Sequence, residues 1–276
     1  MSKRKVIVYK MSSSHIQIER IDDALRQLNL GGMRTSFDKL AQEAIKNSVP
    51  PYDYIERLAQ QEMDWRNVDQ AERRIKAARL PFKKTLEDYD FSLQPTVNPQ
   101  QIYEFASCRF IQKAENIVFL GPEGVGKTHF CSALAQEAIF KGYRVRFYYL
   151  GELIDEIKKK SEGYQRQHLY STLYNTDLFI LDEIGFYEVD DEVSTFLFKL
   201  LQQRYEKGSV ILASQFNFDE WGNIFGNEKR TNAILGRISH HATVVNIDGP
   251  SYRLRDRLPK TQIKPKSNGN GLATLH

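Results

Sequence analysis

The chain has 276 residues, of which 41% are hydrophobic and 27% are charged, with 39 Lys and Arg residues against 35 Asp and Glu residues. At about 100–200 residues per domain, this length predicts one large domain or two unequal ones. Two cysteines are too few for a disulfide framework, and no stretch approaches the ~18–20 consecutive apolar residues of a membrane span. The composition therefore excludes disulfide-rich secreted domains and transmembrane helices, and it predicts a cytoplasmic protein. The net charge of +4 permits nucleic-acid binding without requiring it.

Apolar residues recur at helical spacing through the first part of the chain. The pattern predicts short amphipathic helices over residues 16–30 and 36–47, a third from near residue 52 to beyond residue 63, and a fourth over residues 68–80. Gly31 and Gly32 are expected to end the first of them, because glycine readily adopts the left-handed conformation of a helix C-cap. Residues 1–85 are therefore predicted to form a small, all-helical N-terminal domain.

Prolines interrupt the helical pattern after residue 80. Pro81, Pro95 and Pro99 flank an acidic and aromatic run at residues 86–91, which predicts a linker over residues 86–100. The last segment, residues 259–276, is rich in polar residues and glycine and is predicted to be a basic, disordered tail.

The region between linker and tail alternates between two hydrophobic patterns. Short apolar runs, each suited to a buried strand, lie at residues 117–120, 145–150, 178–181, 210–213 and 243–247. Helical patterns lie at residues 100–109, 128–141, 152–160, 169–174, 191–205 and 233–240. Strands that alternate with helices form a parallel sheet covered on both faces. Residues 101–258 are therefore predicted to be an α/β domain with a five-stranded parallel sheet.

A phosphate-binding motif lies between the first predicted strand and the next helix. The segment matches G-x-x-x-x-G-K-[ST] and consists of Gly121, Pro122, Glu123, Gly124, Val125, Gly126, Lys127 and Thr128. Its glycines allow backbone N–H groups to face phosphate oxygens, and the following helix adds the positive end of its dipole. Lys127 would reach the β- and γ-phosphates, and the Thr128 hydroxyl would ligate Mg²⁺. This context predicts a nucleotide site.

Two further predicted strands end in polar residues. The strand at residues 178–181 is followed by Asp182 and Glu183, and the strand at residues 210–213 by Ser214 and Gln215. Paired with the phosphate loop, Asp182 is predicted to hold Mg²⁺ and Glu183 to orient the attacking water. Because ligands lie at the carboxyl ends of the strands in such sheets, Ser214 or Gln215 is expected near the γ-phosphate or its water.

Several further segments resemble the IstB family, whose members are AAA+ ATPases encoded beside the transposase of certain insertion sequences and related to the DnaC helicase loader. The segments are the phosphate loop followed by His129, residues 181–185 (Leu-Asp-Glu-Ile-Gly), residues 220–226 (Glu-Trp-Gly-Asn-Ile-Phe-Gly), residues 233–241 (Ala-Ile-Leu-Gly-Arg-Ile-Ser-His-His) and residues 249–253 (Gly-Pro-Ser-Tyr-Arg). The resemblance covers nearly the whole chain. It implies an AAA+ P-loop core without the C-terminal helical lid.

The resemblance also implies roles for individual residues. ATP would contact residues 121–128 and His129, with Mg²⁺ held by Thr128 and Asp182 and hydrolysis assisted by Lys127 and Glu183. Arg237 matches an arginine offered to the γ-phosphate of a neighbouring subunit, and Arg253 matches a sensor-2-like arginine. The family usually has Asn where this chain has Gln215, and the longer side chain leads us to expect slower hydrolysis or a displaced water.

Basic residues cluster in three parts of the sequence, in the last N-terminal helix, after the second strand and in the tail. A charge run is commonly a solvated helix face, but relatives that encircle DNA favour contacts to the DNA backbone with little sequence specificity. The predicted DNA contacts are Arg73, Arg74, Lys158, Lys159, Lys160 and Arg166, the last in a loop expected at residues 161–167.

The resemblance, taken with the nucleotide motif and the basic clusters, implies an ATP-dependent assembly factor that forms a ring or filament of identical subunits on duplex DNA. It would select target DNA and recruit or stimulate a transposase encoded by the same element, with ATP hydrolysis at subunit interfaces. A replicative helicase loader of the DnaC type is the alternative with the same core. A scaffold that only binds nucleotide is a third interpretation, against which Glu183 argues.

Overall fold

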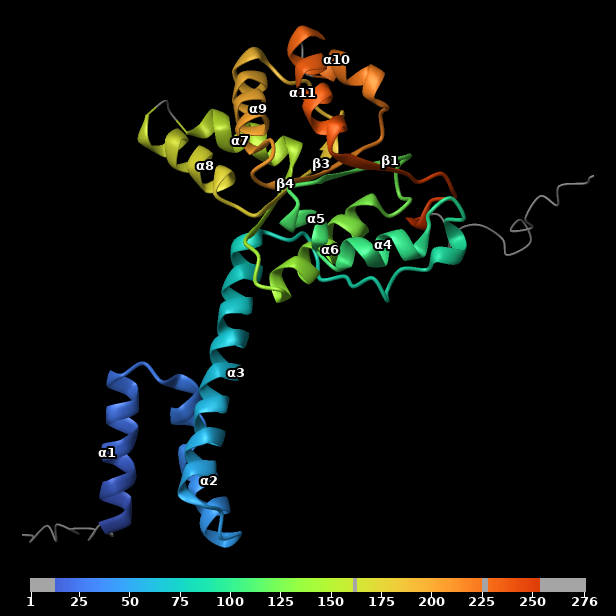
Figure 1. The fold of residues 1–276 in the computed structure, drawn as a ribbon. Helices are drawn as coiled ribbons and strands as arrows, with labels where there is room; N and C mark the ends of the chain where they lie inside the picture. Colours follow the sequence, from blue (N-terminus) through green and yellow to red (C-terminus); the bar gives the residue numbers. More distant parts are fainter. Residues whose placement is uncertain (1–12, 161–162, 225–227, 254–276) are drawn as a thin grey trace, which may run out of the picture. The chain divides into compact units, whose positions relative to one another are not determined.

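The structure is a computed structural model that describes residues 13–160, 163–224 and 228–253 (Figure 1). The chain divides into two compact units, residues 1–74 and residues 75–276. Within the described ranges, no helix combines the length and the apolar character needed to cross a membrane.

The first unit is helical, as predicted. Its elements are α1 (Ser13–Gln27), α2 (Gly31–Lys46) and most of α3 (Pro51–Ala78). The break expected before residue 68, between the third and fourth predicted helices, is wrong, because α3 is one helix of 28 residues. No glycine or proline occurs between Pro51 and Pro81, so nothing in the backbone interrupts the helical hydrogen bonds.

The two glycines predicted to end the first helix begin the second one. The turn before them contains Asn29, whose φ is 54°, and Gly31 and Gly32 are the first residues of α2. A Cβ atom on Gly32 would lie 2.5 Å from the Gln61 carbonyl oxygen of α3. These glycines therefore serve the close approach of α2 to α3 and not a helix cap.

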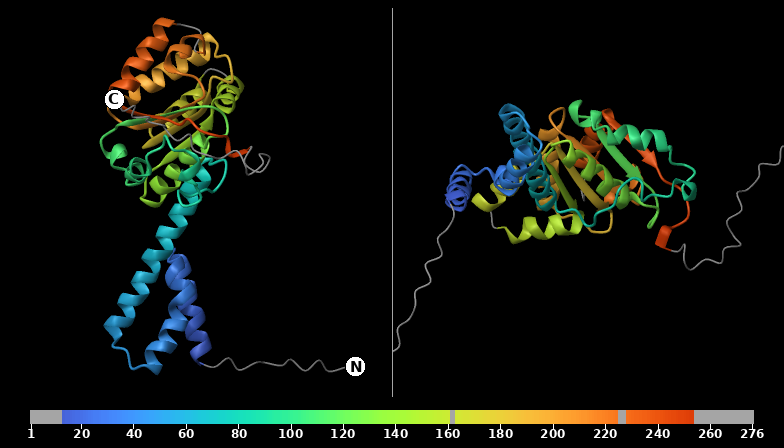
Figure 2. Two further views of the ribbon diagram at one scale, coloured as in Figure 1. Left: turned by 90° about the vertical axis from the view of Figure 1, so that its right-hand side faces the viewer. Right: turned by 90° about the horizontal axis from the view of Figure 1, so that it is seen from below.

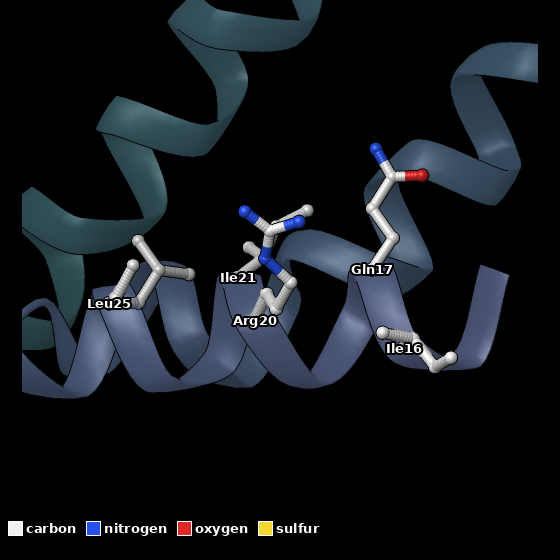
Figure 3. Close-up of a pocket in the computed structure, with 6 residues that line it drawn as sticks. Ile16, Gln17, Arg20, Ile21 and Leu25 are labelled. Atoms are coloured by element: carbon white, nitrogen blue, oxygen red, sulfur yellow. The ribbon is translucent and has the colours of Figure 1, made fainter. Parts of the chain in front are cut away.

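Part of the apolar face of α1 is exposed. A pocket of about 600 Å³ is lined by residues of this one helix, Ile16, Gln17, Arg20, Ile21, Ala24 and Leu25 (Figure 3). Ile16 is 48% exposed and Ile21 is 39% exposed. The pocket is therefore an open groove on the surface of α1.

The second unit is built on a five-stranded sheet in the order β2-β3-β4-β1-β5, with every pair of neighbours parallel. The strands are β1 (Asn116–Leu120), β2 (Val145–Tyr149), β3 (Leu178–Ile184), β4 (Ser209–Ser214) and β5 (Ala242–Asn246). This confirms the predicted α/β class and the five-stranded parallel sheet.

Helices cover both faces of the sheet (Figure 1, Figure 2). One face carries α4 (Pro99–Ala106), α5 (Arg109–Gln112) and α6 (Lys127–Phe140), and the other carries α7 (Leu150–Lys159), α8 (Tyr164–Tyr174), α9 (Asp191–Arg204) and α11 (Glu228–His240). Successive side chains of a strand point to opposite faces, so Ile117 and Phe119 belong to one core and Val118 and Leu120 to the other. Burial on both faces explains why the strands read as continuous apolar runs.

The segment predicted as a linker, residues 86–100, contributes to the core of the second unit. It contains the short 3₁₀ helix η1 (Phe91–Leu93) and the buried residues Leu86, Tyr89 and Val97. Gln94 Nε2 donates a hydrogen bond to the Pro250 carbonyl oxygen at 2.7 Å. Prolines end the helical pattern here, but the apolar side chains between them still pack onto the sheet domain.

The chain after β5 is short within the described range, which ends at Arg253. Short elements between β4 and α11 are η2 (Phe218–Glu220) and α10 (Trp221–Ile224). Residues 247–253 run back along the segment 86–98, where Asp248 N–H donates to Thr96 Oγ1 at 2.9 Å. The predicted tail, residues 259–276, lies outside the described residues.

Candidate nucleotide-binding site

The phosphate-binding motif forms the loop between β1 and α6, and α6 begins at Lys127. Gly124 and Gly126 have φ angles of 77° and 103°, which disfavour any residue with a side chain. A Cβ atom would lie 2.0 Å from Ser251 Oγ at the first position and 2.5 Å from the Tyr89 ring at the second. The loop therefore requires glycine both for its backbone turn and for the side chains that pack against it. The positions between the glycines of the loop are Pro122, Glu123 and Val125.

Lys127 is turned into this loop. Its Nζ donates hydrogen bonds to the Gly121 and Pro122 carbonyl oxygens, at 2.6 Å and 2.7 Å. Burial lowers the pKa of Lys127, whereas the nearby Asp182 carboxylate opposes that shift. The ammonium group is thus held at the position from which phosphate oxygens could replace the two carbonyl acceptors.

Asp182 lies near the end of β3 and is 1% exposed. Its Oδ1 accepts a hydrogen bond from the Glu183 N–H at 2.7 Å, but its Oδ2 is buried with no hydrogen bond of ordinary geometry to any described residue. Burial raises the pKa of Asp182, and the Thr128 hydroxyl beside it acts in the opposite direction. A free carboxylate oxygen next to a hydroxyl fits Mg²⁺, which takes a few protein oxygens and completes its shell with water and phosphate.

Glu183 follows Asp182 with a half-buried side chain and a φ of 58°. A left-handed backbone at a glutamate costs energy and is common where side-chain placement matters for function. Burial and the charge of Asp182 raise the pKa of Glu183, whereas Arg253 lowers it. A carboxylate in this position can accept a hydrogen bond from a water and polarise it.

Arg253 reaches the same site from the end of the described chain. The Tyr252 N–H donates to the Gly124 carbonyl oxygen at 2.8 Å, which fixes this segment against the loop. The Arg253 guanidinium is exposed, and its charge acts on the pKa of both Lys127 and Glu183. The structure therefore brings Arg253 to the loop and to the end of β3.

Ser214 and Gln215 differ in what their side chains do. Ser214 is buried, and its Oγ donates to the Ile184 carbonyl oxygen at 2.8 Å while accepting from the Phe216 N–H at 3.0 Å. These bonds join the end of β3 to the end of β4, so the Ser214 hydroxyl has a structural role. Gln215 lies directly after β4 with a half-buried side chain. Of the two residues, it is the remaining candidate for a contact with the γ-phosphate or its water.

Tyr89 and Tyr252 contact the site but were missed in the sequence. The Tyr89 hydroxyl donates to the Val125 carbonyl oxygen at 2.9 Å, and its ring centroid lies 4.1 Å from that of Phe130. The Tyr252 hydroxyl donates to the Asp90 carbonyl oxygen. The available signals were the acidic and aromatic run at residues 86–91, predicted to be a linker, for Tyr89, and the family-like segment 249–253 for Tyr252.

His129, expected to contact nucleotide, makes a contact within the protein. Its Nε2 lies 2.7 Å from the Thr85 carbonyl oxygen, and burial lowers the pKa of the imidazole. The ring also meets Tyr89 edge-on, with centroids 5.2 Å apart. The structure thus places His129 between α6 and the segment 85–91. A contact to nucleotide stays a prediction.

Arg237 belongs to α11, but its side chain lies outside the described residues.

The predicted DNA contacts lie on several elements and are mostly paired. Lys158 pairs with Asp190, Lys160 with Glu156, Arg73 with Asp69 and Arg166 with Glu192, and Arg74 donates to Gln70. Lys159 is exposed at the end of α7. The loop expected at residues 161–167 is shorter than predicted, because α8 begins at Tyr164.

Comparison with known proteins identifies relatives over most of the chain. The sequence model of a family described as IstB-like ATP binding protein matches residues 23–260. A protein named as an ATP-binding protein of insertion sequence IS21 from Pseudomonas aeruginosa is 36% identical over 240 residues, which cover 87% of this chain and 91% of that protein. The corresponding protein of IS232 from Bacillus thuringiensis subsp. berliner is 36% identical over 244 residues, covering 88% of this chain and 97% of the relative.

Solved structures share the fold of the second unit. The crystal structure of DnaI matches with a TM-score of 0.51 and 23% identity, covering 61% of this chain and 90% of that chain. A DNA replication initiation factor matches with a TM-score of 0.52 and 21% identity, covering 60% of this chain and 50% of that chain. At these identities the likeness shows a shared fold alone. The family match and the identity to insertion-sequence proteins show more, namely that the chain belongs to the IstB-like ATP-binding protein family.

Proposed function

We propose that this protein is an ATP-dependent DNA-binding assembly factor. It oligomerises on duplex DNA, selects target DNA and recruits or stimulates the transposase of its element. One observation carries the proposal: Lys127, Asp182 and Glu183 meet at one edge of the sheet in a chain whose relatives are named as insertion-sequence proteins. A phosphate loop with a carboxylate pair beside it supplies the groups that ATP hydrolysis needs.

The residues of the site divide the work of binding and hydrolysis. Backbone N–H groups of the loop and the N-terminus of α6 hold the phosphates, and Lys127 exchanges its carbonyl partners for the β- and γ-phosphate oxygens. Thr128 and Asp182 would hold Mg²⁺, which when bound neutralises charge on the phosphate oxygens. Glu183 accepts a hydrogen bond from the attacking water and orients it toward the γ-phosphate.

Residues from two subunits complete the proposed reaction. Arg253 acts within its own subunit, because it lies against the phosphate loop. Arg237 acts across the interface on the γ-phosphate of the neighbour. Gln215 places its amide on the attacking water from the end of β4. Hydrolysis then takes place only in the assembled state, so ATP favours assembly on DNA and its loss resets the complex.

DNA binding is assigned to basic residues of the helices. The candidates are Arg73, Arg74, Lys158, Lys159, Lys160 and Arg166. Several of them form exposed ion pairs, but such pairs contribute only about 0–1 kcal/mol, so a DNA phosphate can replace the carboxylate partner. Backbone contacts of this kind bind duplex DNA with strong salt dependence and little sequence specificity.

Sedimentation velocity of the full chain tests this function. With ATP and Mg²⁺, we expect large assemblies on duplex DNA, and we expect them to be lost without nucleotide. The same sequence as single strands serves as the comparison. Preference for the single strand would favour the helicase-loader interpretation, and the absence of nucleotide-dependent assembly on either DNA would contradict the proposal.

A further inference from the structure

A cavity of about 300 Å³ lies in the second unit, and its lining includes none of the residues assigned to the nucleotide site. Its walls come from the end of α3 and from β2, α7 and α8. Its charged lining residues are Lys76, Arg79, Arg146, Glu156 and Lys160, with His168 beside them. We call it the basic cavity. Two basic clusters that are far apart in the sequence, at the exit of α3 and at the end of α7, therefore line one space.

The basic cavity holds four cationic side chains and one carboxylate. Glu156 is shared, with Arg79 Nη1 at 2.6 Å from its Oε2 and Lys160 Nζ at 3.4 Å from its Oε1. The Tyr148 hydroxyl also donates to Glu156 Oε2, at 2.9 Å. One carboxylate thus compensates two of the cations, and its oxygens are already occupied by three donors.

Lys76 and Arg146 have no carboxylate partner among the described residues. The Arg146 guanidinium donates to the Ala77 carbonyl oxygen, which attaches the last turn of α3 to β2. Lys76 is exposed beside it. Positive charges gathered around one space repel one another unless an anion enters it, and guanidinium groups match the geometry of phosphate oxygens.

We propose that the basic cavity binds one phosphodiester group of the backbone of duplex DNA. This inference rests on the proposed function and names the contact surface for it. Lys159 is exposed in the last turn of α7, next to Lys160, and Lys158 in the same turn pairs with Asp190, a surface partner that a DNA phosphate would replace. A strand with regularly spaced phosphates would engage these lysines together with the cavity. A small free anion would contact the cavity alone and would not contact Lys158 and Lys159.

Arg166 has a different role. Its side chain is 19% exposed, it pairs with Glu192, and its Nη2 donates to the Lys160 carbonyl oxygen at 2.9 Å. Arg166 therefore joins α8 and α9 to the end of α7 and positions Lys160.

Fluorescence anisotropy of a labelled duplex, measured against the full chain at several salt concentrations, tests the proposal. In Lys76→Gln/Lys160→Gln we expect at least about tenfold weaker binding, and a log K against log[salt] slope that is shallower by about 1. Lys113→Gln/Lys141→Gln is the matched control, since it removes two exposed lysines elsewhere in the same unit. Equal effects in the two variants, or no change in the first, would overturn the proposal.

The variant Glu156→Gln has the opposite expected effect. Among the described residues that line the basic cavity, Glu156 is the one carboxylate, so its removal makes duplex binding tighter and the salt slope steeper. A variant that merely destabilised the fold would weaken binding instead, and thermal melting of each variant detects such a loss. Weaker binding by a folded Glu156→Gln would therefore count against the basic cavity.

Competitors separate this ligand from other anions. Inorganic phosphate at constant ionic strength and polyglutamate are each added to the complex of wild type with duplex DNA. We expect that neither competitor displaces the duplex when its concentration of anionic groups equals the concentration of DNA phosphates. Displacement by one of them would assign the cavity to free phosphate or to an acidic protein and overturn the proposal. If wild type binds no duplex at all, the DNA-binding part of the proposed function fails as well.

Discussion

Replacing Lys127 with Met is expected to weaken ATP binding by about 100-fold, the scale of losing two charge-assisted hydrogen bonds. Lys127 Nζ makes two short contacts with loop carbonyl oxygens. In the proposed complex, phosphate oxygens would accept these hydrogen bonds instead. Methionine keeps much of the volume of the side chain, so it removes the charge and leaves the packing of α6 in place. Isothermal titration calorimetry with ATP measures the effect.

Lys141→Met is the control for this result, because Lys141 is exposed at the other end of α6. It removes the same charge from the same helix, and we expect ATP affinity within about twofold of wild type. Comparable losses in the two variants would show that net charge, and not the position of Lys127, determines nucleotide affinity.

Replacing Glu183 with Gln is expected to lower ATP turnover by about 10²–10⁴-fold, the usual contribution of a positioned general base. The amide cannot accept the proton of the attacking water, but it preserves the shape of the side chain and the left-handed backbone. We expect ATP affinity to change little, because Glu183 stands beside the phosphate loop and not within it. Release of phosphate during turnover and calorimetric binding separate the two effects.

Glu152→Gln provides the matched comparison for Glu183. Glu152 is exposed on α7, and its charge contributes to the raised pKa of Glu183, so it tests the general effect of removing one nearby negative charge. Its turnover should stay within a few-fold of wild type. Normal hydrolysis by Glu183→Gln would mean that another group activates the water.

Much of the nucleotide site could be predicted because its elements are local in sequence. The loop from Gly121 to Thr128 fixes its own glycine positions and the start of α6, and Asp182 and Glu183 directly follow the apolar residues of β3. Parallel strands bring their carboxyl ends to one edge, so strand positions alone placed these groups together.

The parts that could not be predicted depend on long-range contacts. Nothing near Tyr89 in the sequence indicates that its hydroxyl meets the Val125 carbonyl oxygen, 36 positions further on. The prolines around Tyr89 indicate a break in helical structure, but they do not indicate whether the segment packs against the sheet domain. The same limit hid the basic cavity, since Lys76 and Lys160 are brought together only by the fold.

These long-range contacts also connect the nucleotide site to both ends of its domain. Tyr89 holds the phosphate loop from the N-terminal side, and Tyr252 holds it from the C-terminal side through the Gly124 carbonyl oxygen. Tyr252 in turn donates to the Asp90 carbonyl oxygen, which ties the two segments to each other. The loop is therefore supported on both sides by segments that come before β1 and after β5.

Calorimetric titration of ATP with and without Mg²⁺, on wild type and on Asp182→Asn, is the most direct measurement of the central claim. Asp182 offers a buried carboxylate oxygen beside Thr128, so wild type should bind ATP more tightly with Mg²⁺. In Asp182→Asn that gain should disappear, while binding without Mg²⁺ should strengthen slightly because one negative charge near the triphosphate is gone. Full Mg²⁺ dependence in Asp182→Asn, or no ATP binding by wild type, would contradict the assignment of this edge of the sheet as the nucleotide site.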